Sequence, residues 1–240
     1  MTELDQILLF TVIAGACIPI GGLIASIERI HPGWMENELR HAVIAFGGGI
    51  LLAAVALVLV PDGVEYVDHG MLSTVIFLCG GLCFFALEKR LAARRRQQPQ
   101  LMAMLLDFIP ESMALGGVFA LGSPAAPLLA LFIGLQNLPE GFNAYRELLS
   151  VRSNSRKKIL LTMTAMIFLG PTFALIGYFY FSQNTVLLGA VMLFASGGIL
   201  YLIFQDIAPQ SKMQRHWTPP LGAVLGFSIG MLGNTLIAGH

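Results

Sequence analysis

Four polar side chains lie at helical spacing beside two Pro-Glu dipeptides: Asp107 with Glu111, and Gln136 with Glu140. Residues four apart lie on one face of an α-helix, so each pair is predicted to stack. Each proline also lacks an N–H group and frees a backbone carbonyl in the turn before it. The four side chains offer oxygen without any His or Cys. Such a set favours hard cations such as Mn²⁺ and Fe²⁺, although Zn²⁺ also binds carboxylates well.

The two dipeptides are predicted to meet at one depth of the folded chain. The short connection GSPAAP lies midway between Pro110 and Pro139, so two antiparallel helices joined there bring both Pro-Glu pairs to one level. At 1.5 Å per residue, that level is roughly 20 Å from the connection. A lone proline in such a helix is often only a kink, and a lone acid can be a protonated hydrogen-bonding group. Two copies at matched depth favour a binding site instead.

The surroundings of these residues are predicted to be a lipid bilayer. Hydrophobic residues make up 56% of the 240-residue chain and charged residues only 12%, against roughly a quarter charged in a soluble domain. Apolar runs near the 20 residues that span a bilayer recur along the whole length. We therefore expect a single all-α integral membrane domain, residues 1–240, with eight transmembrane helices at about 7–27, 42–60, 71–87, 101–121, 126–144, 159–181, 186–207 and 221–237.

The distribution of basic residues predicts the orientation of these helices. All 14 Lys and Arg residues fall in the first, third, fifth and seventh connections. The positive-inside rule places those connections in the cytoplasm and both termini outside. Residues 1–6 are acidic and no basic stretch precedes the first apolar run, so this run is expected to be a membrane helix and not a secretory signal.

Acids deep in a bilayer need a compensating positive charge. A charge at the bilayer centre costs at least about 2.5 to 3.5 kcal/mol, and no Lys or Arg lies within any of the eight segments. The remaining candidates are protons, which neutralise carboxylates, or a bound metal cation. The sequence therefore predicts a cation site at the level of the Pro-Glu pairs.

The motifs PES and PEG on consecutive helices of an eight-helix chain resemble those of the ZIP (Zrt-/Irt-like) family of divalent metal transporters. In that family the fourth helix typically carries His-Asn-x-Pro-Glu-Gly and the fifth a similar pattern. The stretches FGGGILLAAVALVLVPDG and FASGGILYLIFQDIAP also look like the Gly-rich second and seventh ZIP helices. Their shared GGIL lies on helices of opposite direction, as in an inverted repeat. The resemblance is to a divergent bacterial-type member.

The resemblance implies one metal site, formed by Asp107, Glu111, Gln136 and Glu140. A second metal is not expected. Phe108 stands where the family usually has Asn, Asn137 is neutral where an acid can occur, and Gly170 precedes Pro171 where many members have Glu.

Other polar residues suggest a route for the cation. An acidic loop on the outer side would raise the local cation concentration, and two polar residues near the cytoplasmic end of the seventh segment stand where the family often has acids or His. Both sets have simpler interpretations, as solvated surface and as a helix cap. The candidate pathway residues are Asn137, Gln205, Asp206, Asp62, Glu65 and Asp68.

These observations predict transport of divalent cations of the zinc, iron or manganese class, with cadmium as a further possible substrate, by alternating access around the midplane site. The expected location is the bacterial inner membrane. The resemblance implies a homodimer surrounded by lipid. No enzymatic activity, cofactor or nucleic-acid partner is expected.

Three other functions remain open from the residues alone. A transport-inactive metal sensor or scaffold fits the loss of ligands at Phe108 and Gly170. A proton-coupled carrier of organic cations could also use buried acids. An intramembrane hydrolase is disfavoured, because no His lies in a core segment to activate Ser112 or another nucleophile.

Overall fold

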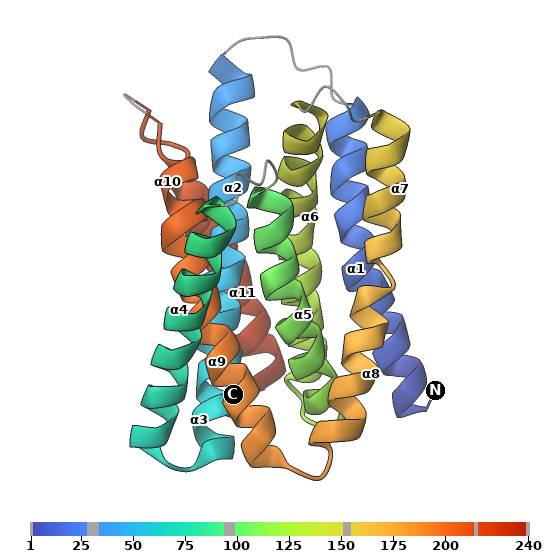
Figure 1. Ribbon diagram of the computed structural model, residues 1–240, viewed down its shortest axis with the longest axis vertical. Helices are drawn as coiled ribbons and strands as arrows, with labels where there is room; N and C mark the ends of the chain where they lie inside the picture. Colours follow the sequence, from blue (N-terminus) through green and yellow to red (C-terminus); the bar gives the residue numbers. More distant parts are fainter. Residues whose placement is uncertain (1, 28–33, 94–98, 151–154, 214–215, 239–240) are drawn as a thin grey trace.

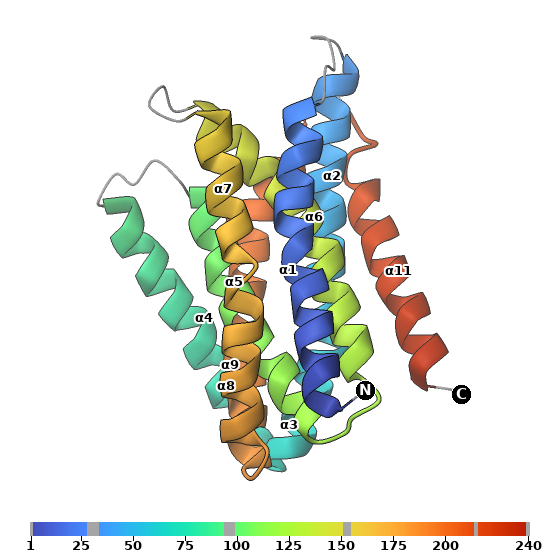
Figure 2. The same ribbon diagram turned by 90° about the vertical axis from the view of Figure 1, so that its right-hand side faces the viewer.

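The computed structural model describes residues 2–27, 34–93, 99–150, 155–213 and 216–238. The described residues form helices and no β-strand, so the predicted all-α class is confirmed. The helices run side by side along the long axis of the molecule (Figures 1 and 2). Their bounds are α1 Glu3–Ile27, α2 Trp34–Ala54, η1 Val55–Leu59, α3 Val60–Val67, α4 Gly70–Ala93, α5 Pro99–Ala120, α6 Ala126–Ser150, α7 Arg156–Met166, α8 Leu169–Phe181, α9 Thr185–Leu202, η2 Ile203–Ile207, α10 Ala208–Ser211 and α11 Leu221–Ala238.

Five helical stretches within the described residues are long and apolar enough to cross a membrane: Glu3–Ile27, Glu38–Val67, Gly70–Arg90, Arg156–Phe181 and Thr185–Ser211. Helix α11 is apolar but shorter over its described part, and helices α5 and α6 are not among the five. The count of eight spans and the outward position of both termini therefore stay predictions.

Prolines change several of the predicted helix boundaries. The predicted segment 159–181 is divided into α7 and α8 at Ile167 and Phe168. Pro171 causes this break, because its ring clashes with the carbonyl of Ile167 four residues earlier. Pro61 and Pro209 instead follow the π-helical segments η1 and η2, and the helix continues past each of them.

The predicted acidic outer loop is therefore partly wrong. Asp62 and Glu65 lie on helix α3. Only Asp68, which ends α3 in a left-handed conformation with φ 49°, leaves the helix. The loop was expected because the apolar run ends at Val60, whereas the helix continues from η1 through Pro61 to Val67.

Close backbone contacts join the helices in four pairs. A Cβ atom on Gly116 of α5 would collide with the backbone of Ala174 on α8, and one on Gly177 of α8 would collide with the backbone of Met113 on α5. Small residues allow such approach between membrane helices. The same reciprocal arrangement joins α1 with α6, α4 with α9, and α2 with α11, through Gly21 and Gly141, Gly80 and Gly197, and Gly49 and Gly222.

These pairs assemble into two groups. The first helix group consists of α1, α5, α6, α7 and α8, and the second helix group consists of α2, α3, α4, α9, α10 and α11. The groups meet chiefly where α2 packs on α6 and α5 on α9. The chain has an internal correspondence in which α1 matches α7–α8, α2 matches α9, α4 matches α11 and α5 matches α6. Under this correspondence the α1–α6 pair matches the α8–α5 pair, the α2–α11 pair matches the α9–α4 pair, and η1 matches η2. Because α1 and α7–α8 run in opposite directions (Figure 2), this is the arrangement expected of an inverted repeat.

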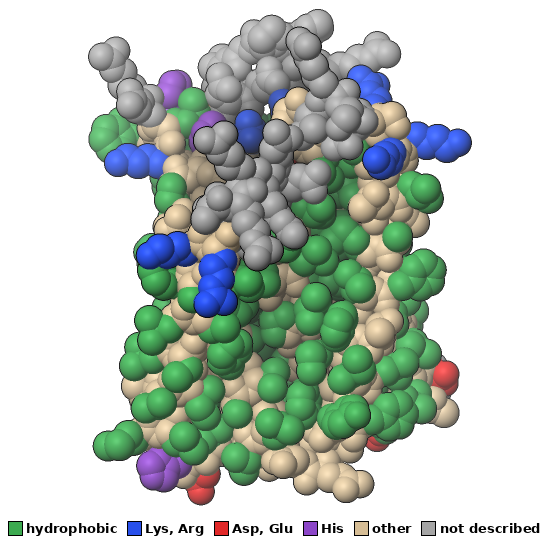
Figure 3. Space-filling model, viewed as in Figure 1, with side chains coloured by type: hydrophobic (Ala, Val, Ile, Leu, Met, Phe, Trp, Pro, Cys, Tyr) green, Lys and Arg blue, Asp and Glu red, His purple; other side chains and the backbone are tan. Residues whose placement is uncertain are grey.

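Charged side chains gather at opposite ends of the molecule. On the face seen in Figure 3, Lys and Arg lie toward the end that holds α7 and α10, the visible acidic side chains lie toward the opposite end, and an apolar belt lies between them. The start of α1 and the end of α11 both lie in the half without Lys and Arg (Figures 1 and 2).

Candidate metal centre

Helices α5 and α6 form an antiparallel pair joined by a short turn, with Pro110 and Pro139 inside them. The four side chains selected from the sequence are all buried between these helices. Glu111 and Gln136 have no exposed surface, and Asp107 and Glu140 are 4% and 5% exposed. Acidic side chains at this depth are rare in proteins unless they are paired or bind a cation.

The structure brings these four side chains together in two cross-helix contacts. Gln136 Nε2 donates a hydrogen bond of 2.5 Å to Glu111 Oε2. The carboxyl groups of Asp107 and Glu140 also lie within hydrogen-bonding reach of each other. The two contacts lie at neighbouring levels of the helix pair, and the negative charges of the three acids act on one another across it.

Several oxygen atoms of this cluster have no hydrogen-bond partner among the described residues. They are Glu111 Oε1, Gln136 Oε1 and Glu140 Oε2, each fully buried. An unsatisfied buried acceptor costs about 1 to 3 kcal/mol, and more when it is charged. Three of them in one place leave lone pairs that a cation could accept.

The ligands are not already arranged as a metal site. Within the described part of the chain, no group of three or more His, Cys, Asp or Glu side chains converges closely enough to hold a metal ion. Gln136 faces Glu111 with its nitrogen, so its amide must rotate to offer oxygen. A hydrogen bond between Asp107 and Glu140 requires a proton on one of them. A metal ion bound here would therefore have to replace the Gln136–Glu111 hydrogen bond and separate the Asp107 and Glu140 carboxyl groups.

Phe108 occupies the place where the resemblance would put ligands of a second metal. Its ring is buried, and its Cζ atom lies against Gly15 of α1 and Gly170 of α8, where it would meet a Cβ atom on either glycine. Asn137 Nδ2 donates a 2.9 Å hydrogen bond to the Ala14 carbonyl of α1, and its Oδ1 is buried without a hydrogen-bond partner among the described residues. Neither residue adds a charged ligand to the cluster.

A second group of acids lies nearer the basic end of the molecule. Asp206, on η2, is half-buried and its carboxyl group lies within hydrogen-bonding reach of Glu88 on α4. The charge of Glu147 on α6 also acts on Asp206. The neighbouring Gln205 is exposed and outside this group. Of the two candidate pathway residues near the basic end, Asp206 is thus the one that the structure places beside other acids.

One face of α6 connects the two acidic groups. Gln136, Glu140, Asn143 and Glu147 follow each other at intervals of three or four residues, so they lie along one side of the helix. Asn143 is 4% exposed, and its Oδ1 atom is buried without a hydrogen-bond partner among the described residues. Sequence reasoning missed Asn143, Glu147 and Glu88. The helical spacing after Glu140 would have revealed the first two.

The candidate pathway residues Asp62, Glu65 and Asp68 lie on or just after α3, at the end of the molecule opposite the basic end. Asp62 is half-buried, whereas Glu65 and Asp68 are exposed. Tyr66 of the same helix lies within hydrogen-bonding reach of Ser123 in the α5–α6 turn. The acidic side chains therefore lie over the end of the helix pair that holds the four-residue cluster.

Comparison with known proteins gives one informative similarity. No protein-family model matches the chain. The chain is 38% identical over 140 residues to a protein named Zinc transporter GufA from Myxococcus xanthus, and the match covers 54% of this chain and 54% of that protein. The chain thus spans about half the length of this curated relative. The similarity supports a relationship to ZIP-like metal transporters.

Proposed function

We propose that this protein is an integral membrane transporter of divalent metal cations of the zinc, iron or manganese class. The observation that carries this proposal is the set of three fully buried oxygen atoms on Glu111, Gln136 and Glu140 that have no hydrogen-bond partner in the described part of the chain. No Lys or Arg lies between residues 99 and 139 to neutralise the acids of the cluster. The printed name of the partial relative, a zinc transporter, agrees with this substrate class.

The cation site of the proposal consists of Asp107, Glu111, Gln136 and Glu140 and holds a single metal ion. A divalent cation is favoured over two separate protons, because one ion satisfies oxygens from both helices at once. The apolar ring of Phe108 argues against a second ion beside the first. The proximity of the Asp107 and Glu140 carboxyl groups supports proton exchange, since a bound metal would displace a proton shared by them.

The distribution of Lys and Arg determines the proposed orientation of the protein in the membrane. The basic end of the molecule (Figure 3) is cytoplasmic, both termini are extracytoplasmic, and the eight helical segments cross the inner membrane. The metal enters from the acidic end past Asp62, exchanges water for the cluster oxygens, and leaves along α6 through Asn143 to Glu147, Asp206 and Glu88. A homodimer, implied by the resemblance alone, remains a prediction.

The test is metal uptake into proteoliposomes by Glu111→Gln and Glu140→Gln. Each substitution keeps the shape of the side chain but removes a charged ligand, so uptake should fall by at least about tenfold, the smaller end of the effects seen when metal-site partners are changed. Glu3→Gln, which removes a carboxylate at the start of α1, is the matched control and should transport normally. Undiminished uptake by both cluster variants at equal protein content would refute the site.

A transport-inactive metal sensor or scaffold is the second candidate function. The observation in its favour is Phe108, whose buried ring fills space that metal ligands could occupy. Metal binding to the purified protein without uptake into proteoliposomes would support this alternative. Binding and uptake that are both lost in Glu140→Gln would support the transporter.

A further inference from the structure

A cavity of about 360 Å³ lies between helices α1, α2 and α6, and none of the four cluster residues lines it. Its wall is apolar over most of its length. The cavity is at the border of the two helix groups, because α1 and α6 belong to the first group and α2 to the second. Its apolar lining includes Ile24 of α1, Leu39, Val43 and Phe46 of α2, and Leu138 and Phe142 of α6.

Two apolar residues that line this cavity are exposed on the surface of the molecule. Ile24 is 48% exposed and Leu39 46% exposed, and both line the cavity. Both belong to helical stretches apolar enough to cross a membrane. In a bilayer, an apolar opening between α1 and α2 faces acyl chains and not water. An acyl chain is therefore the natural occupant of the interior.

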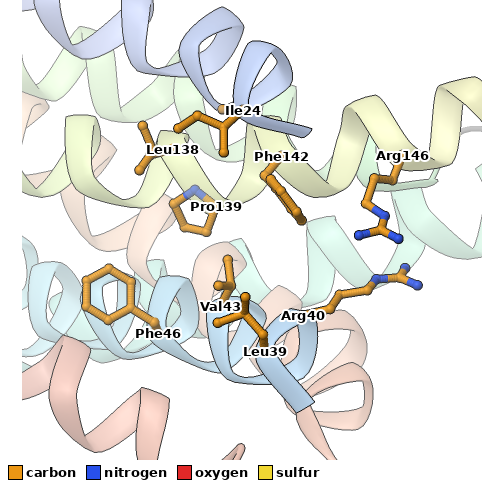
Figure 4. Close-up of a pocket in the computed structure, with 10 residues that line it drawn as sticks. Ile24, Leu39, Arg40, Val43, Phe46, Leu138, Pro139, Phe142 and Arg146 are labelled. Carbon is orange, nitrogen blue, oxygen red and sulfur yellow. The ribbon is translucent and has the colours of Figure 1, made fainter. Parts of the chain in front are cut away.

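One end of the cavity is basic. Arg40 of α2 and Arg146 of α6 line it, and Figure 4 shows their guanidinium groups directed toward the same space, beyond the apolar residues. Arg146 is held over the ring of Phe142, with Cζ 5.7 Å from the ring centroid. The positions of the two arginines on neighbouring helices suit a group with several negatively charged oxygens, such as a phosphate diester.

We propose that this cavity binds an anionic phospholipid, with one acyl chain between α1, α2 and α6 and the phosphate between Arg40 and Arg146. The basic end of the molecule supports this choice, because anionic lipids are enriched in the cytoplasmic leaflet and basic pockets between membrane helices bind their head groups. The acyl chain would contact Pro139, which directly precedes Glu140, on one side and Phe46 on the other. The lipid would thus join the two helix groups at their border. This inference does not depend on metal transport.

The experiment titrates the delipidated full-length protein with phosphatidylglycerol and with phosphatidylcholine of identical acyl chains, and counts bound lipid by native mass spectrometry. The wild-type protein should bind phosphatidylglycerol more tightly. Arg40→Gln/Arg146→Gln should weaken that binding by about thirtyfold, since each basic residue near an anionic lipid contributes roughly a fivefold gain. Val43→Phe should weaken binding of both lipids by filling the cavity.

Two matched controls separate the cavity from general effects. Arg156→Gln/Lys157→Gln removes the same charge from exposed residues of α7 at the same end, and Val75→Phe adds the same ring to the exposed face of α4. Both controls should bind lipid as the wild type does. Inorganic phosphate alone should not compete, because it lacks the acyl chain.

Equal loss of phosphatidylglycerol binding in Arg40→Gln/Arg146→Gln and in the control Arg156→Gln/Lys157→Gln would overturn the proposal. Full lipid binding by Val43→Phe would also overturn it. A Val43→Phe protein that changes from dimer to monomer with unchanged lipid binding would also overturn it, and would identify a second copy of the chain as the occupant. Helical circular dichroism and a single size-exclusion peak confirm that each variant is folded before titration.

Discussion

At the scale of single residues, the cluster between α5 and α6 combines three acids with one amide. Gln136 is the neutral member, and its nitrogen is committed to Glu111. Its oxygen, buried and without a described partner, is the atom that could join a metal shell. The residue type at this position should therefore affect which metal is preferred more than whether metal binds at all.

Gln136→His tests this role in metal preference. Imidazole nitrogen suits Zn²⁺ better than Mn²⁺, so the ratio of zinc to manganese uptake should rise by roughly threefold or more. Competition between the two radiolabelled metals in proteoliposomes measures the ratio. Thr162→Ala, an exposed change on α7, serves as the control and should leave it unaltered. An unchanged ratio in Gln136→His would contradict a ligand role for this position.

Asn143 is the residue that links the cluster to the acids near the basic end. Asn143→Leu removes a buried carbonyl with no described partner, so the thermal stability of the protein should be unchanged or higher. Maximal uptake should nevertheless fall about fivefold, the effect of raising one barrier by ~1 kcal/mol. The metal concentration at half-maximal uptake should change little, because the cluster itself is intact. Unaltered maximal uptake would remove Asn143 from the proposed route.

At the scale of elements, close helix packing fixes the positions of the acids. Helix α5 is held against α8 through Gly116 and Gly177, and α6 against α1 through Gly21 and Gly141. The backbones in these pairs are so close that any side chain at the glycine positions must push the helices apart. The relative heights of Asp107 and Glu140 thus depend on contacts that lie outside the cluster.

Gly116→Val should reduce the free energy of unfolding by about 1 to 3 kcal/mol or more, as overpacking does in a close-packed interior. The matched control is Gly70→Val, because a Cβ atom at Gly70 would meet nothing within 4 Å. The control should change stability by less than about 0.5 kcal/mol. Thermal unfolding in detergent, followed by circular dichroism, provides the comparison. Equal melting temperatures for the two variants would show that the α5–α8 contact is less tight than described.

Much of this architecture follows from patterns in the sequence. Apolar runs locate the helices, and the equal distances of Pro110 and Pro139 from their connection predict that Asp107, Glu111, Gln136 and Glu140 meet. These features depend on local spacing, which a sequence displays directly.

Other features depend on tertiary packing and could not be read in advance. The approach of Glu88 to Asp206 needs α4 to pack on α9, and Glu88 precedes Lys89 in what looks like an ordinary helix end. The π-helical turns before Pro61 and Pro209 have no clear signature in residue type. Phe108 beside Gly170 requires α5 and α8 in contact, although the two residues are far apart in sequence.

At the scale of the whole molecule, charge and apolar surface divide the protein into a basic end, a belt and an acidic end (Figure 3). The same division predicts the position of the termini. Alkaline phosphatase fused after residue 240 should be active in a bacterial host, and green fluorescent protein at the same place should be dark, if the C-terminus lies outside the cytoplasm as we propose. Fusions after Lys158, near the start of α7 at the basic end, should give the opposite pair of results. Fluorescence from the C-terminal fusion would reverse the proposed orientation.

The division into two helix groups has a consequence for how an ion could cross. All four donors of the cluster belong to α5 and α6, inside the first helix group, and none comes from the second. If the first group slides along its neighbour, the coordination shell travels as one piece and no ligand has to be exchanged midway. The energy barrier to this sliding motion would then arise at the interface where α2 packs on α6 and α5 on α9. Residues that never contact the metal ion would thus set the transport rate.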